Sequence, residues 1–175
     1  MNAQDVILGS RAVHVRELQS EVDRLRQENR RLREANEELT AHFDLALTAA
    51  EDLRTLTADG RLVLVDGWNL ILGAEREARD REDLLAQARA HVAARPQDLV
   101  WIVLDGPRAA TTTEGRVRVT YTGGEGPHRA DRFICDFLRM AQFRGDVSRI
   151  EVRTHDKDFR KTVARLAPQA GMGIK

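Results

Sequence analysis

A long stretch without glycine or proline, residues 11–56, leaves few folding options for the first third of the chain. Apolar residues recur through it with heptad spacing. The d positions are Leu18, Leu25, Leu32, Leu39, Ala46 and Leu53, and the a positions are Val15, Val22, Asn29, Asn36, Phe43 and Ala50. Leucine at d with valine and asparagine at a is typical of two parallel helices in a coiled coil. We therefore predict a coiled-coil dimerisation helix over residues 1–57, with a parallel homodimer formed through residues 12–56.

Charged residues beside this seam favour the parallel arrangement. Glu21 and Glu28 occupy g positions, and Arg26 and Arg33 occupy e positions. In a parallel pair each g residue faces the following e residue of the partner, so glutamate meets arginine, whereas an antiparallel pair would set like charges together. Each exposed pair adds only roughly a few tenths of a kcal/mol. Two alternatives stay open: a lone helix folded back on its own domain, and docking on a larger protein or ribonucleoprotein partner.

After residue 60 the pattern changes to short apolar runs that alternate with helical stretches. Strands are predicted over 62–65, 99–104, 116–121, 150–154 and 173–175, and helices over 75–94, 128–144 and 156–166. The alternation within 116–121 is typical of an edge strand. Strands that alternate with helices predict an α/β domain with a mostly parallel sheet, which we expect to span residues 60–175.

Aspartates follow the three strongest predicted strands. They are Asp66, Asp105 and Asp156, and a fourth, Asp131, lies on the sheet-facing side of the first turn of helix 128–144. Because ligands of such sheets bind at the carboxyl ends of the strands, we expect these four side chains to converge there. Each aspartate alone is also explained as a turn or helix-capping residue, so the convergence is what favours a site.

Four gathered carboxylates repel one another unless a cation neutralises them. Mg²⁺ and Mn²⁺ prefer oxygen ligands, and a site of this kind can activate water for displacement at phosphorus. The four aspartates therefore predict a Mg²⁺ or Mn²⁺ site typical of a metal-dependent nuclease. Zinc is not expected, because the five histidines are scattered and there is one cysteine.

Four short motifs together resemble the NYN domain family of PIN-like ribonucleases, and most closely its YacP-like branch. They are DGWN at 66–69, the strand ending in Asp105, GEGPHRAD at 124–131 and THDKDF at 154–159. The resemblance covers residues 60–175 and implies a PIN-like fold with endoribonuclease activity. It also implies that the four aspartates bind the metal and are catalytic, that Asp158 is a further ligand, and that Asn69 orients Asp66 or contacts a phosphate. Trp68 stands where the family usually has tyrosine.

Positive charge is concentrated towards the C-terminus. Residues 106–175 carry 14 basic and 8 acidic side chains, although the whole chain is neutral. Such an excess attracts RNA, and it also suits a solvated surface that balances the acidic part of the chain. The candidate nucleic-acid-binding residues are Asn69, Arg108, Arg129, Arg132, Lys157 and Lys161.

Composition bounds the setting of the protein. No stretch approaches the roughly 18 consecutive apolar residues of a membrane span, and the lone Cys135 excludes an intramolecular disulfide. We therefore expect a cytoplasmic protein without a membrane partner. Its predicted function is that of a metal-dependent endoribonuclease. The alternative is a non-catalytic RNA-binding or adaptor protein of the same fold that docks through its coiled coil.

Overall fold

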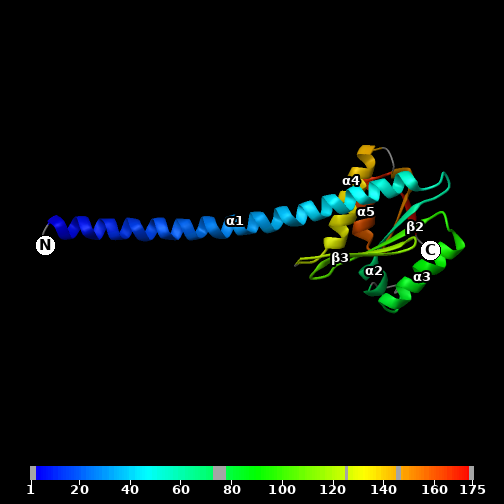
Figure 1. Ribbon diagram of the computed structural model, residues 1–175, viewed down its shortest axis with the longest axis horizontal. Helices are drawn as coiled ribbons and strands as arrows, with labels where there is room; N and C mark the ends of the chain where they lie inside the picture. The colour runs from blue at the N-terminus through cyan, green and yellow to red at the C-terminus, as the bar shows by residue number, and fades with distance from the viewer. Residues whose placement is uncertain (1–2, 73–77, 125, 145–146, 174–175) are drawn as a thin grey trace. The chain divides into compact units, whose positions relative to one another are not determined.

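The computed structural model describes residues 3–72, 78–124, 126–144 and 147–173 (Figure 1). Two compact units, Met1–Ala41 and His42–Lys175, make up the chain. Helix α1 (Ala3–Thr55) provides the first unit, and its last turns belong to the second. The helical prediction for the heptad segment is thus confirmed. Among the described residues, no helix combines the length and the apolar character needed to cross a membrane.

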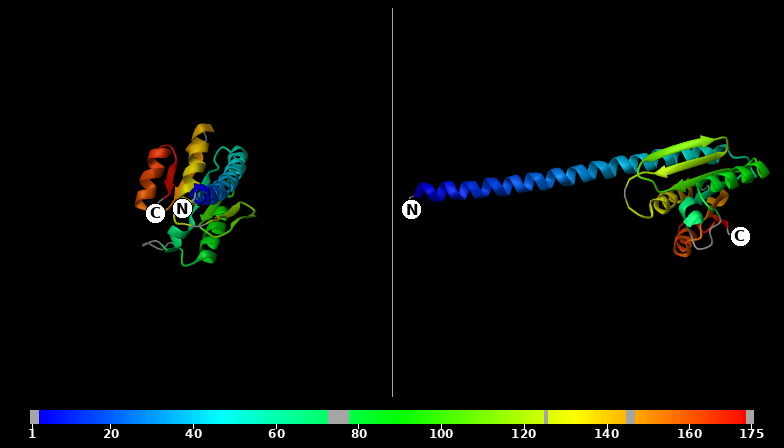
Figure 2. Two further views of the ribbon diagram at one scale, coloured as in Figure 1. Left: turned by 90° about the vertical axis from the view of Figure 1, so that its left-hand side faces the viewer. Right: turned by 90° about the horizontal axis from the view of Figure 1, so that it is seen from below.

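A single six-stranded sheet forms the centre of the second unit, in the order β3-β4-β2-β1-β5-β6. The strands are β1 (Leu62–Asp66), β2 (Leu99–Leu104), β3 (Ala109–Glu114), β4 (Val117–Thr122), β5 (Ile150–Arg153) and β6 (Gly171–Gly173). Neighbouring strands pair in parallel except β3 and β4, whose antiparallel arrows are visible in the right-hand view of Figure 2. The predicted α/β domain with a mostly parallel sheet is confirmed.

Helices cover both faces of this sheet. They are α2 (Gly67–Leu72), α3 (Arg81–Ala94), α4 (Arg129–Arg144) and α5 (Lys157–Leu166), with a 3-10 turn at Val147–Arg149. Successive strand residues point to opposite faces, so Leu62 and Leu64 join the core with α4 and α5, whereas Val63 and Val65 join the core with α2 and α3 (Figure 1). Burial on both faces explains why β1 is a continuous apolar run.

Aromatic packing holds α4 on the sheet. Trp101 of β2 is fully buried and meets Phe133 and Phe137 of α4 edge to face, with ring centroids 5.2 and 5.6 Å apart. Its indole Nε1 donates to Oγ1 of Thr120 on β4 at 2.8 Å, so the polar atom of this buried ring is paired. These contacts hold α4 against the strands from which the candidate site is built.

Several predicted elements differ from the structure. The prediction of an edge strand at 116–121 was wrong, because β4 lies between β3 and β2. Its alternation arises because Val117 and Val119 are buried against α3 while Arg118 is only half-buried on the other face. Helix 75–94 is described only from Arg81 onward as α3, and residues 73–77 lie outside the described residues. The last strand is 171–173, and residues 174–175 of the predicted strand also lie outside the described part.

The end of α1 is anchored in the second unit. Leu53 and Leu56 are 1% and 7% exposed and belong to the same core as α4 and α5. The guanidinium of Arg149 donates to the carbonyl oxygens of Leu53, Thr57 and Gly60, at 3.2, 2.6 and 3.3 Å. The last carbonyls of a helix lack partners within the helix, so Arg149 caps α1 and fixes the turn that leads into β1.

Replacing Arg149 by alanine is expected to lower the free energy of unfolding by roughly 1–3 kcal/mol, because several carbonyl oxygens lose a charged donor. Urea unfolding followed by circular dichroism measures the change. Arg139→Ala is the matched control, because Arg139 is exposed and paired only with Asp136 among the described residues, and such pairs contribute less than about 1 kcal/mol. Equal losses in the two variants would contradict a capping role for Arg149.

Candidate functional site

The candidate site lies where the direction of the chain along the sheet reverses. From β1 the chain continues through α2 and α3 on one face to β2, whereas from β5 it continues through α5 on the other face to β6. Between β1 and β5 the sheet therefore has a topological switch point, and ligands of open α/β sheets bind outside the carboxyl ends of the strands at such a point. Asp66 ends β1, and Asp156 follows β5 as the N-cap of α5.

Asp66 is the most perturbed carboxyl of the site. It is 5% exposed, and it accepts hydrogen bonds from Oγ1 of Thr154 at 2.9 Å and from the backbone N–H of Asn69. Burial, followed by the nearby negative charges of Asp131 and Asp105, outweighs these two donors and raises the pKa of Asp66 to about 7. Without a cation, this carboxyl therefore keeps its proton to a higher pH than an ordinary aspartate does.

Asp131, in the first turn of α4, is electrostatically linked to the other three aspartates. Burial raises its pKa, and the charges of Asp156 and Asp105 raise it further, while a contact of 3.1 Å between its Oδ2 and Nδ1 of His128 opposes them. Asp66 in turn feels the charge of Asp131. The structure thus brings together four aspartates from four separate places in the chain, and Asp131 influences or is influenced by each of the other three through space.

Asp105 and Asp156 each use one carboxylate oxygen to hold a helix. Oδ1 of Asp105 accepts from the backbone N–H of Ala130 in α4 at 2.6 Å, and also from Oγ1 of Thr122 at 3.4 Å. Oδ1 of Asp156 accepts from the backbone N–H groups of Asp158 and Phe159 in α5, at 2.8 and 3.0 Å. Among the described residues, neither Oδ2 atom has a hydrogen-bond partner. Capping and ligand binding are therefore compatible in both aspartates.

The donor set fits a hard divalent cation in chemistry and charge. All four side chains offer carboxylate oxygens, which Mg²⁺ and Mn²⁺ prefer, and a cation would neutralise the charges of Asp131 and Asp105 that, after burial, raise the pKa of Asp66. Within the described ranges, however, no three acidic, histidine or cysteine side chains form a coordination set as they stand. Ion binding would therefore require the carboxylates to draw closer together.

A groove of about 530 Å³ runs beside the first turns of α4 and α5. Asp131 and Asp156 line it together with Arg132, His128 and Phe159. Asp158 also lines this groove, but its side chain is 89% exposed and pairs with Lys161 at 2.8 Å. This exposure and the ion pair with Lys161 place Asp158 at the rim of the groove.

The predicted nucleic-acid-binding residues occupy different environments. Arg108, Arg132 and Lys157 are exposed, as a phosphate contact requires. Asn69 is half-buried, and its Oδ1 accepts from the backbone N–H of His155 at 2.8 Å, which ties α2 to the loop after β5. Arg129, another predicted nucleic-acid-binding residue, is only 8% exposed, and its guanidinium lies against Gly124.

Sequence reasoning missed two threonines that position the aspartates. Thr154 follows β5 and bonds Asp66, and Thr122 ends β4 and bonds Asp105. Both are buried, with 3% and 4% exposure. The available signal was their place at the same edge of the sheet, since a hydroxyl at the carboxyl end of a strand can reach the end of a neighbouring strand.

Comparison of the chain with family models, curated proteins and solved structures finds no match. The α/β architecture therefore rests on the structure itself, and the resemblance to the NYN family rests on the four motifs.

Replacing Asp66 by asparagine is expected to stabilise the metal-free protein at pH 8 and to have a smaller stabilising effect at pH 5. A carboxyl whose pKa rises to about 7 on folding contributes stability at low pH that is lost as the pH rises through 7. Asparagine does not ionise, and it keeps an oxygen that can accept from Thr154. Urea unfolding in EDTA at both pH values measures the difference between the variant and the wild type.

Asp59→Asn is the matched control, because Asp59 is exposed in the turn that precedes β1, at the opposite end of the strand from Asp66. Because Asp59 lies outside the aspartate cluster, this variant measures the effect of an Asp-to-Asn change made away from the site. An Asp66→Asn effect of the same size at pH 5 and pH 8 would contradict the raised pKa.

Proposed function

We propose that residues 60–175 form a PIN-like, metal-dependent endoribonuclease that cleaves RNA phosphodiester bonds with Mg²⁺ or Mn²⁺. The observation that carries this proposal is the position of four aspartates at one end of the sheet: Asp66 ends β1, Asp105 follows β2, Asp156 caps α5 after β5, and Asp131 lies in the first turn of α4. Helix capping by itself explains the positions of Asp105 and of Asp156. It does not explain why Asp66 is buried and Asp131 half-buried near them. Gathering like charges destabilises a fold, and such perturbed groups cluster at functional sites.

Asp66, Asp105, Asp131 and Asp156 would hold the ion. When bound, Mg²⁺ or Mn²⁺ lowers the pKa of a water molecule and stabilises charge on the reacting phosphate. The chain's own contribution is to hold the ligands in place. Thr154 and the backbone of Asn69 orient Asp66 by hydrogen bonds, while the N–H groups at the starts of α4 and α5 fix one oxygen each of Asp105 and Asp156.

Substrate binding would use the exposed basic side chains near this end of the sheet. Arg132 lines the same groove as Asp131, and Lys157 is the first residue of α5, directly after Asp156. Contacts of this kind to phosphates position a nucleic acid without reading its sequence. The choice of RNA over DNA follows from the resemblance to PIN-like ribonucleases.

A non-catalytic RNA-binding or adaptor protein is the second candidate. The observation that favours it is that the described side chains do not form a ready coordination set. The two candidates differ in one consequence: only the nuclease requires ionisable carboxylates at positions 66 and 131.

Cleavage of end-labelled RNA by the purified chain tests the proposed function. We expect fragments in Mn²⁺ or Mg²⁺, none in EDTA, and none with Asp66→Asn or Asp131→Asn, while Asp59→Asn cleaves like the wild type. Fragments that persist in both site variants would indicate a contaminating nuclease or a different site. Absence of cleavage with retained RNA binding would favour the adaptor.

Thr154→Val is expected to reduce cleavage by roughly 10–100-fold, because residues that orient metal ligands typically contribute that much to activity or affinity. Thr154→Ser keeps the hydroxyl and should restore most of the activity. The Mn²⁺ concentration that gives half-maximal cleavage is measured as well. If Thr154 only supports the fold, its replacement should leave that concentration unchanged. We expect that concentration to rise in Thr154→Val and to stay near the wild-type value in Thr154→Ser.

A further inference from the structure

One face of α1 carries a row of apolar side chains that are largely exposed. Their exposed fractions range from 43% for Val22 to 64% for Leu32. The row consists of Val15, Leu18, Val22, Leu25, Leu32 and Leu39. An exposed apolar row of this kind, interrupted only by Asn29 and Asn36, marks an interaction site.

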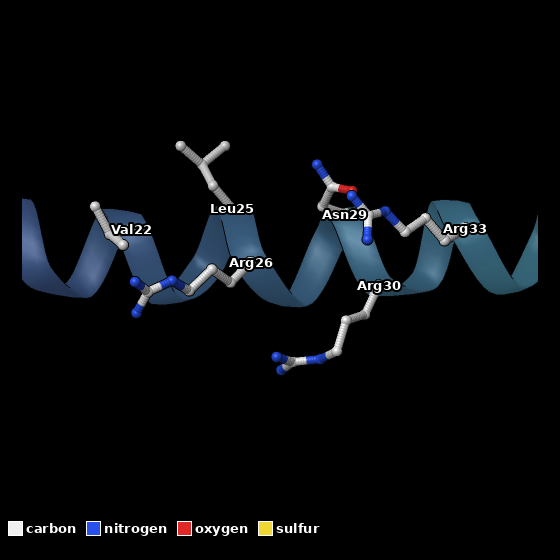
Figure 3. A pocket seen from close by; sticks show the side chains of 6 residues that line it. All are labelled: Val22, Leu25, Arg26, Asn29, Arg30 and Arg33. Atoms are coloured by element: carbon white, nitrogen blue, oxygen red, sulfur yellow. The ribbon is translucent and has the colours of Figure 1, made fainter.

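Two hollows on this face repeat with the heptad period. The first is lined by Val15, Leu18, Gln19 and Val22, and also by Asp23 and Arg26. The second is lined by Val22, Leu25, Arg26 and Asn29, and also by Arg30 and Arg33. Figure 3 shows Leu25 and Asn29 on the same side of the helix, with Arg30 directed away from them.

Both hollows contain the same four heptad positions: an a residue, the following d and e residues, and the next a residue. In a coiled coil, each apolar side chain of one helix inserts into a hole formed by four residues of the facing helix. When two parallel helices are in register, a d residue lies opposite the d residue of its partner. The hollow around Leu18 therefore has the composition that receives a second Leu18, and the hollow around Leu25 the composition that receives a second Leu25.

We infer that this face binds a second copy of the chain, parallel and in register, over residues 15–39. The inference concerns the first unit and does not rest on the proposed nuclease function.

Charge complementarity selects a second copy in the parallel orientation. Glu21 would face the partner's Arg26, and Glu28 would face the partner's Arg33, so all four interhelical pairs of the dimer are attractive. In the single helix, Glu21 and Glu28 instead share Arg24, at 2.6 and 3.6 Å. All these side chains are exposed in α1 and are available to pair across a seam.

Two asparagines make the alignment specific. In register, Asn29 meets the partner's Asn29 and Asn36 meets the partner's Asn36, so each amide finds a hydrogen-bonding partner in the apolar seam. A shift of one heptad would leave one asparagine of each helix opposite an apolar residue, and an antiparallel pair would set asparagine near leucine. A buried amide without a partner costs free energy, so both alternatives are disfavoured.

Sedimentation of the full chain, combined with disulfide cross-linking, tests the inference. We expect a dimer at micromolar concentrations and rapid cross-linking of Leu18→Cys to itself. Gln27→Cys, at an f position outside the seam, should not cross-link. The native Cys135 is buried, and mapping of the cross-linked peptides distinguishes it from the introduced cysteine. A monomer, a trimer, or cross-linking of Leu18→Cys to Leu39→Cys in a mixture would overturn the inference.

The variant Leu25→Lys tests whether the dimer can be lost while the second unit stays folded. It should yield a monomer whose second unit unfolds at the wild-type temperature, while Gln27→Lys remains a dimer. A Leu25→Lys protein that stays dimeric would show that other surfaces hold the copies together, and would also overturn the inference. Because none of these measurements uses RNA or metal, their outcome is independent of the cleavage experiments.

Discussion

Parallel hydrogen bonding of β1 with β2 on one side and β5 on the other is the constraint on which the second unit depends. It aligns Asp66 with Val103 near the end of β2, and it places the end of β1 beside the end of β5. The loops after these strands therefore emerge at one edge, and the helices that return along the sheet begin there. Asp131 joins the other three aspartates because α4 begins at that edge and is held by its packing on Trp101.

At the carboxyl ends of the strands, what stabilises individual helices conflicts with what stabilises the whole fold. Helix capping is satisfied by one oxygen each of Asp105 and Asp156, which is favourable. Burying the carboxyl of Asp66 and placing negative charge beside it are both unfavourable, and together, burial first, they raise its pKa. In most of a natural protein, helix capping, core packing and electrostatics favour the same structure. A conflict between them is expected where function requires it.

The parts of this structure that the sequence could predict are those with local causes. The apolar runs of β1 and β2 and the heptads of α1 reflect burial or periodicity, and the meeting of the aspartates follows from a general rule for parallel sheets. Strand β3 was missed because its residues, AATTTE, are exposed and lack an apolar pattern. The bond between Thr154 and Asp66 joins residues 88 positions apart, and the burial of Arg129 depends on its neighbour Gly124. Such contacts appear only when the tertiary structure is known.

Two helices begin at the aspartate cluster and direct backbone N–H groups at Asp105 and Asp156. The amino end of a helix carries partial positive charge, so these amides already offset part of the charge that a cation would neutralise. A cation arriving at the cluster would thus gain less free energy than it would from four isolated carboxylates. If the proposed ion binds here, the capping amides would therefore make its occupancy weaker than four uncapped carboxylates would.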